Sequence, residues 1–130
     1  METTAVRWDM LSARCPTRDV LTRVADKWTM LVITVLEPEE SVRFSELRRR
    51  IEGVSQKMLT QTLRSLQRDG LVTRTAYPTV PVTVTYALTP LGRSLAEAVD
   101  GIRTWAYGNM DEIEQARTAY DAQAAVAPDG

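Results

Sequence analysis

The hydrophobic pattern of this chain changes at Gly70 from a helical period to an alternating one, and this change limits the folds open to it. Before Gly70, apolar residues recur at helical spacing in several short segments. After it, Leu71–Tyr77 and Val82–Leu88 carry the alternating, β-branched pattern of two strands, joined by Pro78–Pro81. The 130 residues are enough for one hydrophobic core, so we expect a mainly α domain with a two-stranded hairpin.

Two helices with a short turn between them precede the hairpin. Ser45 is the expected N-cap of the first, Glu52–Val54 forms the turn, and Ser55 caps the second, which runs to Asp69. One face of the second helix is largely apolar and consists of Leu59, Thr62, Leu63 and Leu66. Its opposite face is basic and amide-rich and consists of Lys57, Gln61, Arg64 and Arg68, flanked by Gln56, Thr60 and Ser65. A helix-turn-helix followed directly by a hairpin is a winged helix.

Further helices are expected on both sides of this motif. Thr17 is a possible cap for a first helix with an apolar stripe, and a second helix follows until Pro38 stops it. After the hairpin, Thr89 and Pro90 open a helix, and a second apolar set follows Gly108. The predicted division is an N-terminal arm at 1–16, a winged helix-turn-helix core at 17–89, C-terminal dimerisation helices at 90–120 and a flexible tail at 121–130.

Four aromatic residues lie in the two ends of the chain, outside the helix-turn-helix, namely Trp8, Trp105, Tyr107 and Tyr120. Such residues either pack on their own domain or form an interface between subunits, and we favour the interface. The candidate interface residues are Trp8, Leu95, Val99, Ile102, Trp105, Ile113 and Tyr120.

Charge is segregated along the chain, although the formal net charge is only -1. Residues 43–74 hold eight basic side chains against three acidic ones, whereas residues 75–89 hold no charge at all and both ends are acidic. A basic middle between acidic ends suits a surface that meets a polyanion, although a solvated Arg-rich helix face has the same composition.

Two absences restrict the chemistry. The chain has no histidine and a single cysteine, Cys15, which excludes an intrachain disulfide, a Cys/His zinc site of the usual four-ligand kind and a His-dependent nucleophilic site. We therefore expect no metal, no cofactor and no enzymatic activity. No apolar run is long enough for a signal peptide or a membrane span, so we expect a cytoplasmic protein without a membrane partner.

Short motifs along the chain resemble the HxlR-type transcription regulators, a branch of the winged-helix repressors related to the MarR group. The resemblance covers roughly residues 15 to 107 and is carried by Cys15-Pro16, Asp26–Thr29, Arg43–Leu47, Val54–Thr60 with Leu63, Asp69–Val72, Val80-Pro81, Val84, Tyr86–Thr89 and Leu91-Gly92. It implies a homodimeric, sequence-specific DNA-binding regulator with the helix from Ser55 in the major groove. Two departures stand out. Val82–Thr85 replaces a segment that often carries a charged pair, and Asp26 replaces a usual glycine, a change to which we attach no function.

The residue types fit direct reading of double-stranded DNA. Arg and Lys suit guanine and Gln suits adenine, so Arg64 or Lys57 is expected to read a guanine, and Gln56 or Gln61 an adenine. The side chains expected to reach DNA are Ser55, Gln56, Lys57, Thr60, Gln61 and Arg64 on the recognition helix and Arg43, Arg48, Arg49 and Arg74 outside it. In the uncharged wing, binding to phosphate would rest on Arg74, Thr79 and backbone N–H groups. A two-fold dimer would favour an inverted-repeat operator.

Cys15 is the candidate regulatory residue. It resembles the N-terminal cysteine that many members of the family share and that senses oxidants or electrophiles in some of them. Arg14, Arg18 and a nearby helix start would each favour its thiolate. The alternatives are a structural Cys15 in a regulator that answers to a small apolar effector, and a winged-helix module that binds protein.

Overall fold

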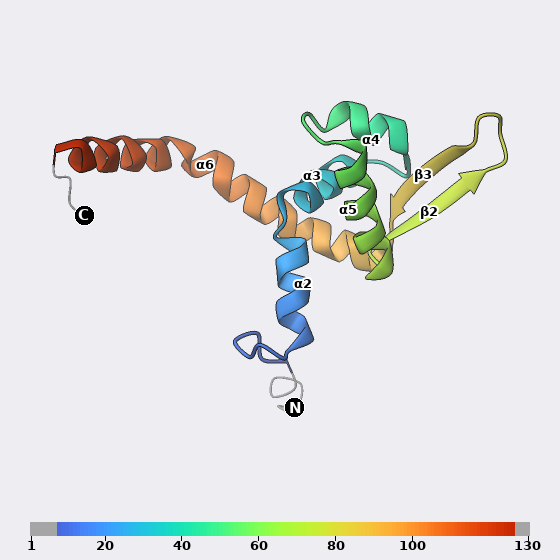
Figure 1. Ribbon diagram of the computed structural model, residues 1–130, viewed down its shortest axis with the longest axis horizontal. Helices are drawn as coiled ribbons and strands as arrows, with labels where there is room; N and C mark the ends of the chain where they lie inside the picture. Colours follow the sequence, from blue (N-terminus) through green and yellow to red (C-terminus); the bar gives the residue numbers. More distant parts are fainter. Residues whose placement is uncertain (1–7, 127–130) are drawn as a thin grey trace. The chain divides into compact units, whose positions relative to one another are not determined.

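The computed structural model describes residues 8–126 (Figure 1). The helices are α2 (Pro16–Val24), α3 (Lys27–Leu36), α4 (Phe44–Arg50), α5 (Gln56–Arg68) and α6 (Pro90–Val126), and the strands are β1 (Val42–Arg43), β2 (Val72–Tyr77) and β3 (Thr83–Leu88). The chain divides into two compact units, of which the first ends at Glu97 and the second starts at Ala98. No helix in the described part is both long and apolar enough to pass through a bilayer.

Two N-caps at the start of the chain were not predicted from the sequence. Cys15, not Thr17, is the N-cap of α2, because Pro16 takes the first helical position, where its missing N–H is not needed. Asp26 is the N-cap of α3, a role that was not predicted from the sequence. Its carboxylate accepts hydrogen bonds from the backbone N–H groups of Trp28 at 3.0 Å and Thr29 at 3.3 Å.

The winged helix-turn-helix is confirmed, with one additional strand. The sheet has three antiparallel strands in the order β1-β3-β2, rather than the two expected. Val42 and Arg43 form β1 and pair with Tyr86 and Thr85 of β3. Since the chain is still extended at Arg43, this residue is the N-cap of α4, and Ser45, the expected cap, lies inside the helix. Two residues are too few to show an alternating pattern, so periodicity could not predict β1.

Helix α5 matches its prediction closely. Ser55 caps it by accepting a hydrogen bond on Oγ from the N–H of Met58 at 3.1 Å. At the other end Gly70 adopts a φ of 77°, a left-handed conformation that favours glycine. The predicted inward face, Leu59, Thr62, Leu63 and Leu66, is buried, and α5 packs on α3, whose Val32, Ile33 and Leu36 complete the core with Leu47.

The first turn of α6 is fixed to the end of α5. Thr89 donates a hydrogen bond from Oγ1 to the carbonyl of Gly70 at 2.6 Å and accepts one from the N–H of Gly92 at 3.0 Å, which makes it the predicted N-cap. Gly92 is required here, because a Cβ would lie 2.0 Å from the carbonyl oxygen of Leu71. These bonds position the wing relative to α5.

Helix α6 is continuous, whereas the sequence predicts two helices separated near Gly108. Gly108 keeps a negative φ, and a glycine inside a helix costs only about 1 kcal/mol, which is not enough to end it. Asn109 donates a hydrogen bond to the carbonyl of Trp105 within the same helix. Residues 121–126 are helical, where we expected a flexible tail, and residues 127–130 lie outside the described part.

Candidate nucleic-acid interface

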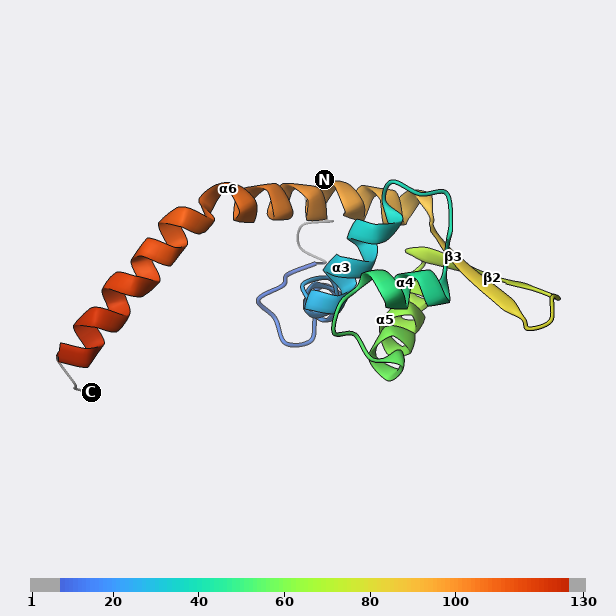
Figure 2. The ribbon, with the colours of Figure 1, turned by 90° about the horizontal axis from the view of Figure 1, so that it is seen from above.

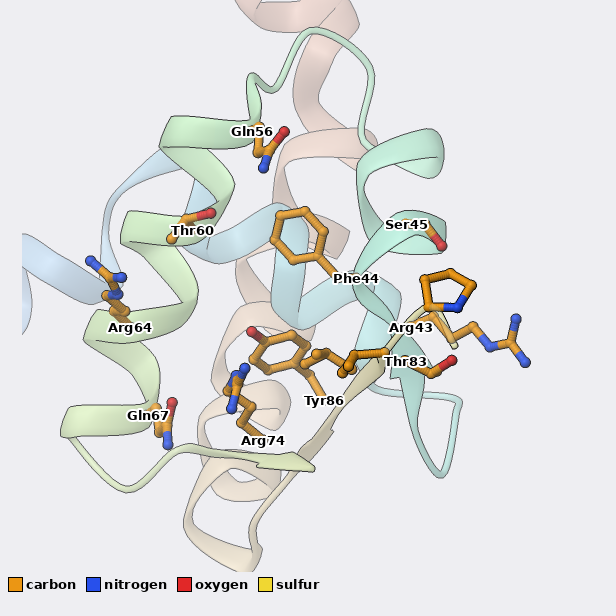
Figure 3. Close-up of a pocket in the computed structure, with 13 residues that line it drawn as sticks. Arg43, Phe44, Ser45, Gln56, Thr60, Arg64, Gln67, Arg74, Thr83 and Tyr86 are labelled. Atoms are coloured by element: carbon orange, nitrogen blue, oxygen red, sulfur yellow. The ribbon is translucent and has the colours of Figure 1, made fainter. Parts of the chain in front are cut away.

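A groove of about 700 Å³ lies between α5, the start of α4 and the wing. Figure 3 shows side chains of α5 along one wall, with Phe44, Arg74 and Tyr86 between it and Ser45. The residues that line it are Arg43, Phe44, Ser45, Gln56, Thr60, Arg64, Gln67, Arg74, Pro81, Val82, Thr83, Val84 and Tyr86. Five of these, namely Arg43, Gln56, Thr60, Arg64 and Arg74, are residues that the sequence predicts to contact DNA.

Three guanidinium groups give this groove its charge. Arg43, Arg64 and Arg74 are exposed, and within residues 8–126 no carboxylate forms an ion pair with any of them. An unpaired guanidinium can bind a phosphate without first losing an internal partner. The groove can therefore accept the phosphate backbone of a nucleic acid.

The outward face of α5 continues from this groove. Gln56, Lys57, Gln61 and Arg64 are exposed, Thr60 is half-buried, and the five line a shallow depression along the helix. Ser55 is exposed, but its hydroxyl oxygen is engaged as the N-cap. The face offers ammonium, guanidinium and amide groups on consecutive turns, which is the set of donors and acceptors that base edges in a major groove require.

The arginines of α4 are already engaged. Arg49 forms an ion pair with Glu46, with Nε 3.2 Å from Oε1, and this guanidinium lowers the pKa of the Glu46 carboxyl below its ordinary value. Arg48 donates a hydrogen bond from Nη1 to Oε1 of Gln56 at 3.3 Å. Arg48 therefore orients Gln56 in addition to contributing charge.

Sequence reasoning missed the floor of the groove. The rings of Phe44 and Tyr86 lie 6.5 Å apart between centroids and are tilted by 50°, and Tyr86 is buried. Gln67 lies on the same wall as Arg64. Only the pairing of β1 with β3 brings Phe44 beside Tyr86, so no local pattern in the sequence could have found this pair.

Cys15 is buried, with 9% of its surface exposed. The pKa of its thiol is lowered mainly by a hydrogen bond with the Thr17 side chain, and further by backbone hydrogen bonds with residues that include Thr17 and Arg18, while burial opposes the shift. From the sequence we expect the charges of Arg14 and Arg18 to favour the thiolate of Cys15. The structure differs, because neither guanidinium group contributes to the lowered pKa of this thiol.

The residues expected at a subunit interface are mostly accessible. Ile102 is 49% exposed, Trp105 61% and Tyr120 72%, whereas Val99 is only 3% exposed in the single chain. Trp8 is exposed, and Leu95 and Ile113 are half-buried. Helix α2 buries none of its residues, although its sequence predicts an apolar stripe.

Within the described part of the chain, no three acidic or cysteine side chains come together in a way that could hold a metal ion. The surface of the groove and of α5 consists of hydrogen-bonding groups and positive charges, with an aromatic floor.

The chain is similar to known transcriptional regulators. The family model for the HxlR-like helix-turn-helix matches residues 23–114. The uncharacterized HTH-type transcriptional regulator YtfH of Escherichia coli is 44% identical over 105 residues, which cover 81% of this chain and 82% of the relative. A solved structure of ytfH, a transcriptional regulator from Salmonella typhimurium, matches with a TM-score of 0.82 and 38% identity over 85% of this chain and 98% of the other.

The redox regulator HypR in its oxidized form matches with a TM-score of 0.66 and 36% identity over 73% of this chain and 97% of the other. The match of the family model to most of the chain, together with the similarity to these regulators, shows that the chain belongs to the HxlR-like helix-turn-helix family of DNA-binding transcriptional regulators.

Proposed function

We propose that the protein is a homodimeric repressor that binds an inverted-repeat operator, with α5 in the major groove of each half-site. The observation that carries the proposal is the groove that Arg43, Arg64 and Arg74 share with polar side chains of α5, where none of the three forms an ion pair with a carboxylate of residues 8–126. We infer that the protein is cytoplasmic, because the relatives it matches are transcriptional regulators.

The side chains proposed to contact DNA fall into two sets, one that would contact bases and one that would contact phosphates. Lys57, Gln61 and Arg64 lie on the exposed face of α5 and would contact base edges, which specify sequence. Arg43 of β1 and Arg74 of β2 line the same groove as α5 and would bind phosphates, which position the protein. The ion pair between Arg49 and Glu46 would have to be shared or opened on binding, so we expect Arg49 to contribute less than Arg43.

The homodimer is supported by the apolar surface that the single chain leaves exposed. In the second unit, residues 98–126 form part of one helix, whose Ile102, Trp105 and Tyr120 are accessible. A helix gains most of its stability from packing an apolar face, and a second copy of the chain would supply that packing. A two-fold dimer would place its recognition helices about 34 Å apart, one turn of DNA.

We further propose that oxidation of Cys15 controls DNA binding. HypR, which matches this chain, is named a redox regulator and was solved in oxidized and reduced forms, and the lowered pKa of Cys15 favours the reactive thiolate. As the single cysteine of the chain, Cys15 could form an intersubunit disulfide, a mixed disulfide with a small thiol, or an electrophile adduct. For the first, two Cys15 thiols lose two protons and two electrons to the oxidant, and one S–S bond forms between their Sγ atoms.

The test uses fluorescence anisotropy with two kinds of labelled DNA: the region upstream of the protein's own gene, and duplexes that the purified protein enriches from a random library. We expect tight, salt-sensitive binding by the reduced protein and weaker binding after treatment with diamide, an effect that Cys15→Ser abolishes. Failure to enrich any duplex would contradict DNA binding. Binding that ignores diamide would contradict redox control, and the search would turn to a small apolar effector.

A further inference from the structure

The tip of the wing is apolar and projects into solvent. Val80 is 99% exposed, Val82 64% and Tyr77 46%, and no residue from 75 to 89 carries a charge. Figures 1 and 2 show the β2–β3 hairpin extending away from α3, α4 and α5 in both views. The side chain at position 80 is therefore not covered by any described part of its own chain.

The tip is also internally ordered. Thr79 donates a hydrogen bond from Oγ1 to the carbonyl of Pro81 at 2.7 Å, and its Oγ1 lies 3.0 Å from that of Thr83. The backbone N–H of Thr79 is bonded to the carbonyl of Tyr77 at 2.8 Å. These bonds occupy the donors of Thr79 that the sequence assigned to phosphate binding, so Thr79 holds the turn and Val80 forms its outer surface.

This apolar tip is continuous with the proposed DNA surface. Pro81 and Val82 line the same groove as Arg64 and Arg74, and Val80 is the next residue along the chain. A duplex held by the arginines and read by α5 would pass directly beside the tip. Phosphate binding needs a cation or a donor, and the side chain of Val80 offers neither.

The walls of the minor groove suit such a tip better, because they are formed by the C–H surfaces of the sugars. Proteins also insert apolar side chains between base steps from this side and kink the duplex there. Building on the proposed DNA binding, we propose that Val80, held out between Thr79 and Pro81, is an apolar wedge for the minor groove beside each half-site. The wedge favours pyrimidine–purine steps at that position, since these unstack most easily.

The test measures binding of three proteins to duplexes that the wild type enriches from a random library. Val80→Ser removes the wedge at a fully exposed position, and Val126→Ser is the matched control at an 83% exposed valine of α6. We expect Val80→Ser to raise Kd about tenfold for each wing engaged, with an unchanged dependence on salt, because the substitution removes no charge. Val126→Ser should bind like the wild type.

Two further readouts locate the tip. Hydroxyl-radical footprinting should show protected minor-groove sugars flanking each half-site for the wild type, and this protection should disappear in Val80→Ser. In Val80→Arg the slope of log Kobs against log salt should steepen by about 0.9 for each wing that reaches a phosphate.

The outcomes separate this proposal from the proposed function. If the wild type enriches no duplex, both fail together. If Val80→Ser binds enriched DNA as well as the wild type and leaves the footprint unchanged, the wedge is wrong while DNA binding stands. If Val80→Arg also leaves the salt dependence unchanged, the tip does not reach DNA, and an apolar tip that binds a protein partner becomes the better explanation.

Discussion

Arg23 of α2 donates a hydrogen bond from Nη1 to Oδ2 of Asp69, the C-cap of α5, at 3.1 Å. Its other terminal nitrogen binds Asp19 at 2.9 Å, one turn earlier in α2. The helix that starts after Cys15 is thus joined through a single guanidinium to the end of the proposed recognition helix.

We expect Arg23→Gln to lower the free energy of unfolding by about 1–3 kcal/mol, because both side chains are only about one-fifth exposed and Asp69 would lose its charged partner. Asp19→Asn is the control, since Asp19 is 71% exposed and its ion pair should contribute less than about 0.5 kcal/mol. Urea unfolding followed by circular dichroism measures both. Equal losses of stability in the two variants would contradict a structural role of the pair with Asp69.

The N-cap at Asp26 gives a second prediction. Asp26→Ala should destabilise the protein by about 1 kcal/mol, because the N–H groups of Trp28 and Thr29 lose their acceptor. Asp26→Asn should retain most of the stability, and Asp26→Gly should cost only a few tenths of a kcal/mol, which fits the glycine that is usual at this position in the family. Thermal and urea unfolding of the three variants check the order Asp, Asn, Gly, Ala.

Removal of a groove arginine should change how binding depends on salt. Arg74→Ala should flatten the slope of log Kobs against log salt by about 0.9 for each phosphate that the variant no longer binds, and Arg43→Ala should do the same. Arg117→Ala serves as the control, because Arg117 is an exposed arginine of α6 outside the groove. A slope that is unchanged in both groove variants would exclude these residues as phosphate ligands.

The reactivity of Cys15 should depend on Thr17. The pKa of this thiol lies below its ordinary value mainly because of the hydrogen bond with the Thr17 side chain. A lower pKa means that the thiolate persists to lower pH, so the rate of alkylation by iodoacetamide should reach half its maximum at a lower pH in the folded protein than in the urea-unfolded one.

In Thr17→Val this midpoint should move up toward the unfolded value, because the largest cause of the shift is removed. Thr22→Val is a matched control, since the Thr22 hydroxyl bonds to the carbonyl of Arg18 within the same helix. A midpoint that moves equally in both variants would assign the shift to the helix as a whole.

Sequence reasoning was most accurate where structure depends on local periodicity. The ends of α5 follow from the Ser55 cap and Gly70, and its buried and exposed faces follow from the helical repeat. The hairpin follows from alternation and a proline-containing turn. It was wrong at β1, at the caps of α2 and α4, and at Gly108. At each of these places the structure depends on one or two residues, which are too few to form a periodic pattern.

The sequence by itself determined which face of α5 is polar, because each turn of a helix places its side chains without reference to the rest of the chain. Only the tertiary structure decided that Arg43 and Arg74 share a groove with that face. Arg43 pairs with Thr85 and Arg74 with Tyr86, on opposite edges of β3. This arrangement depends on hydrogen bonds between strands far apart in sequence, and no local pattern encodes it.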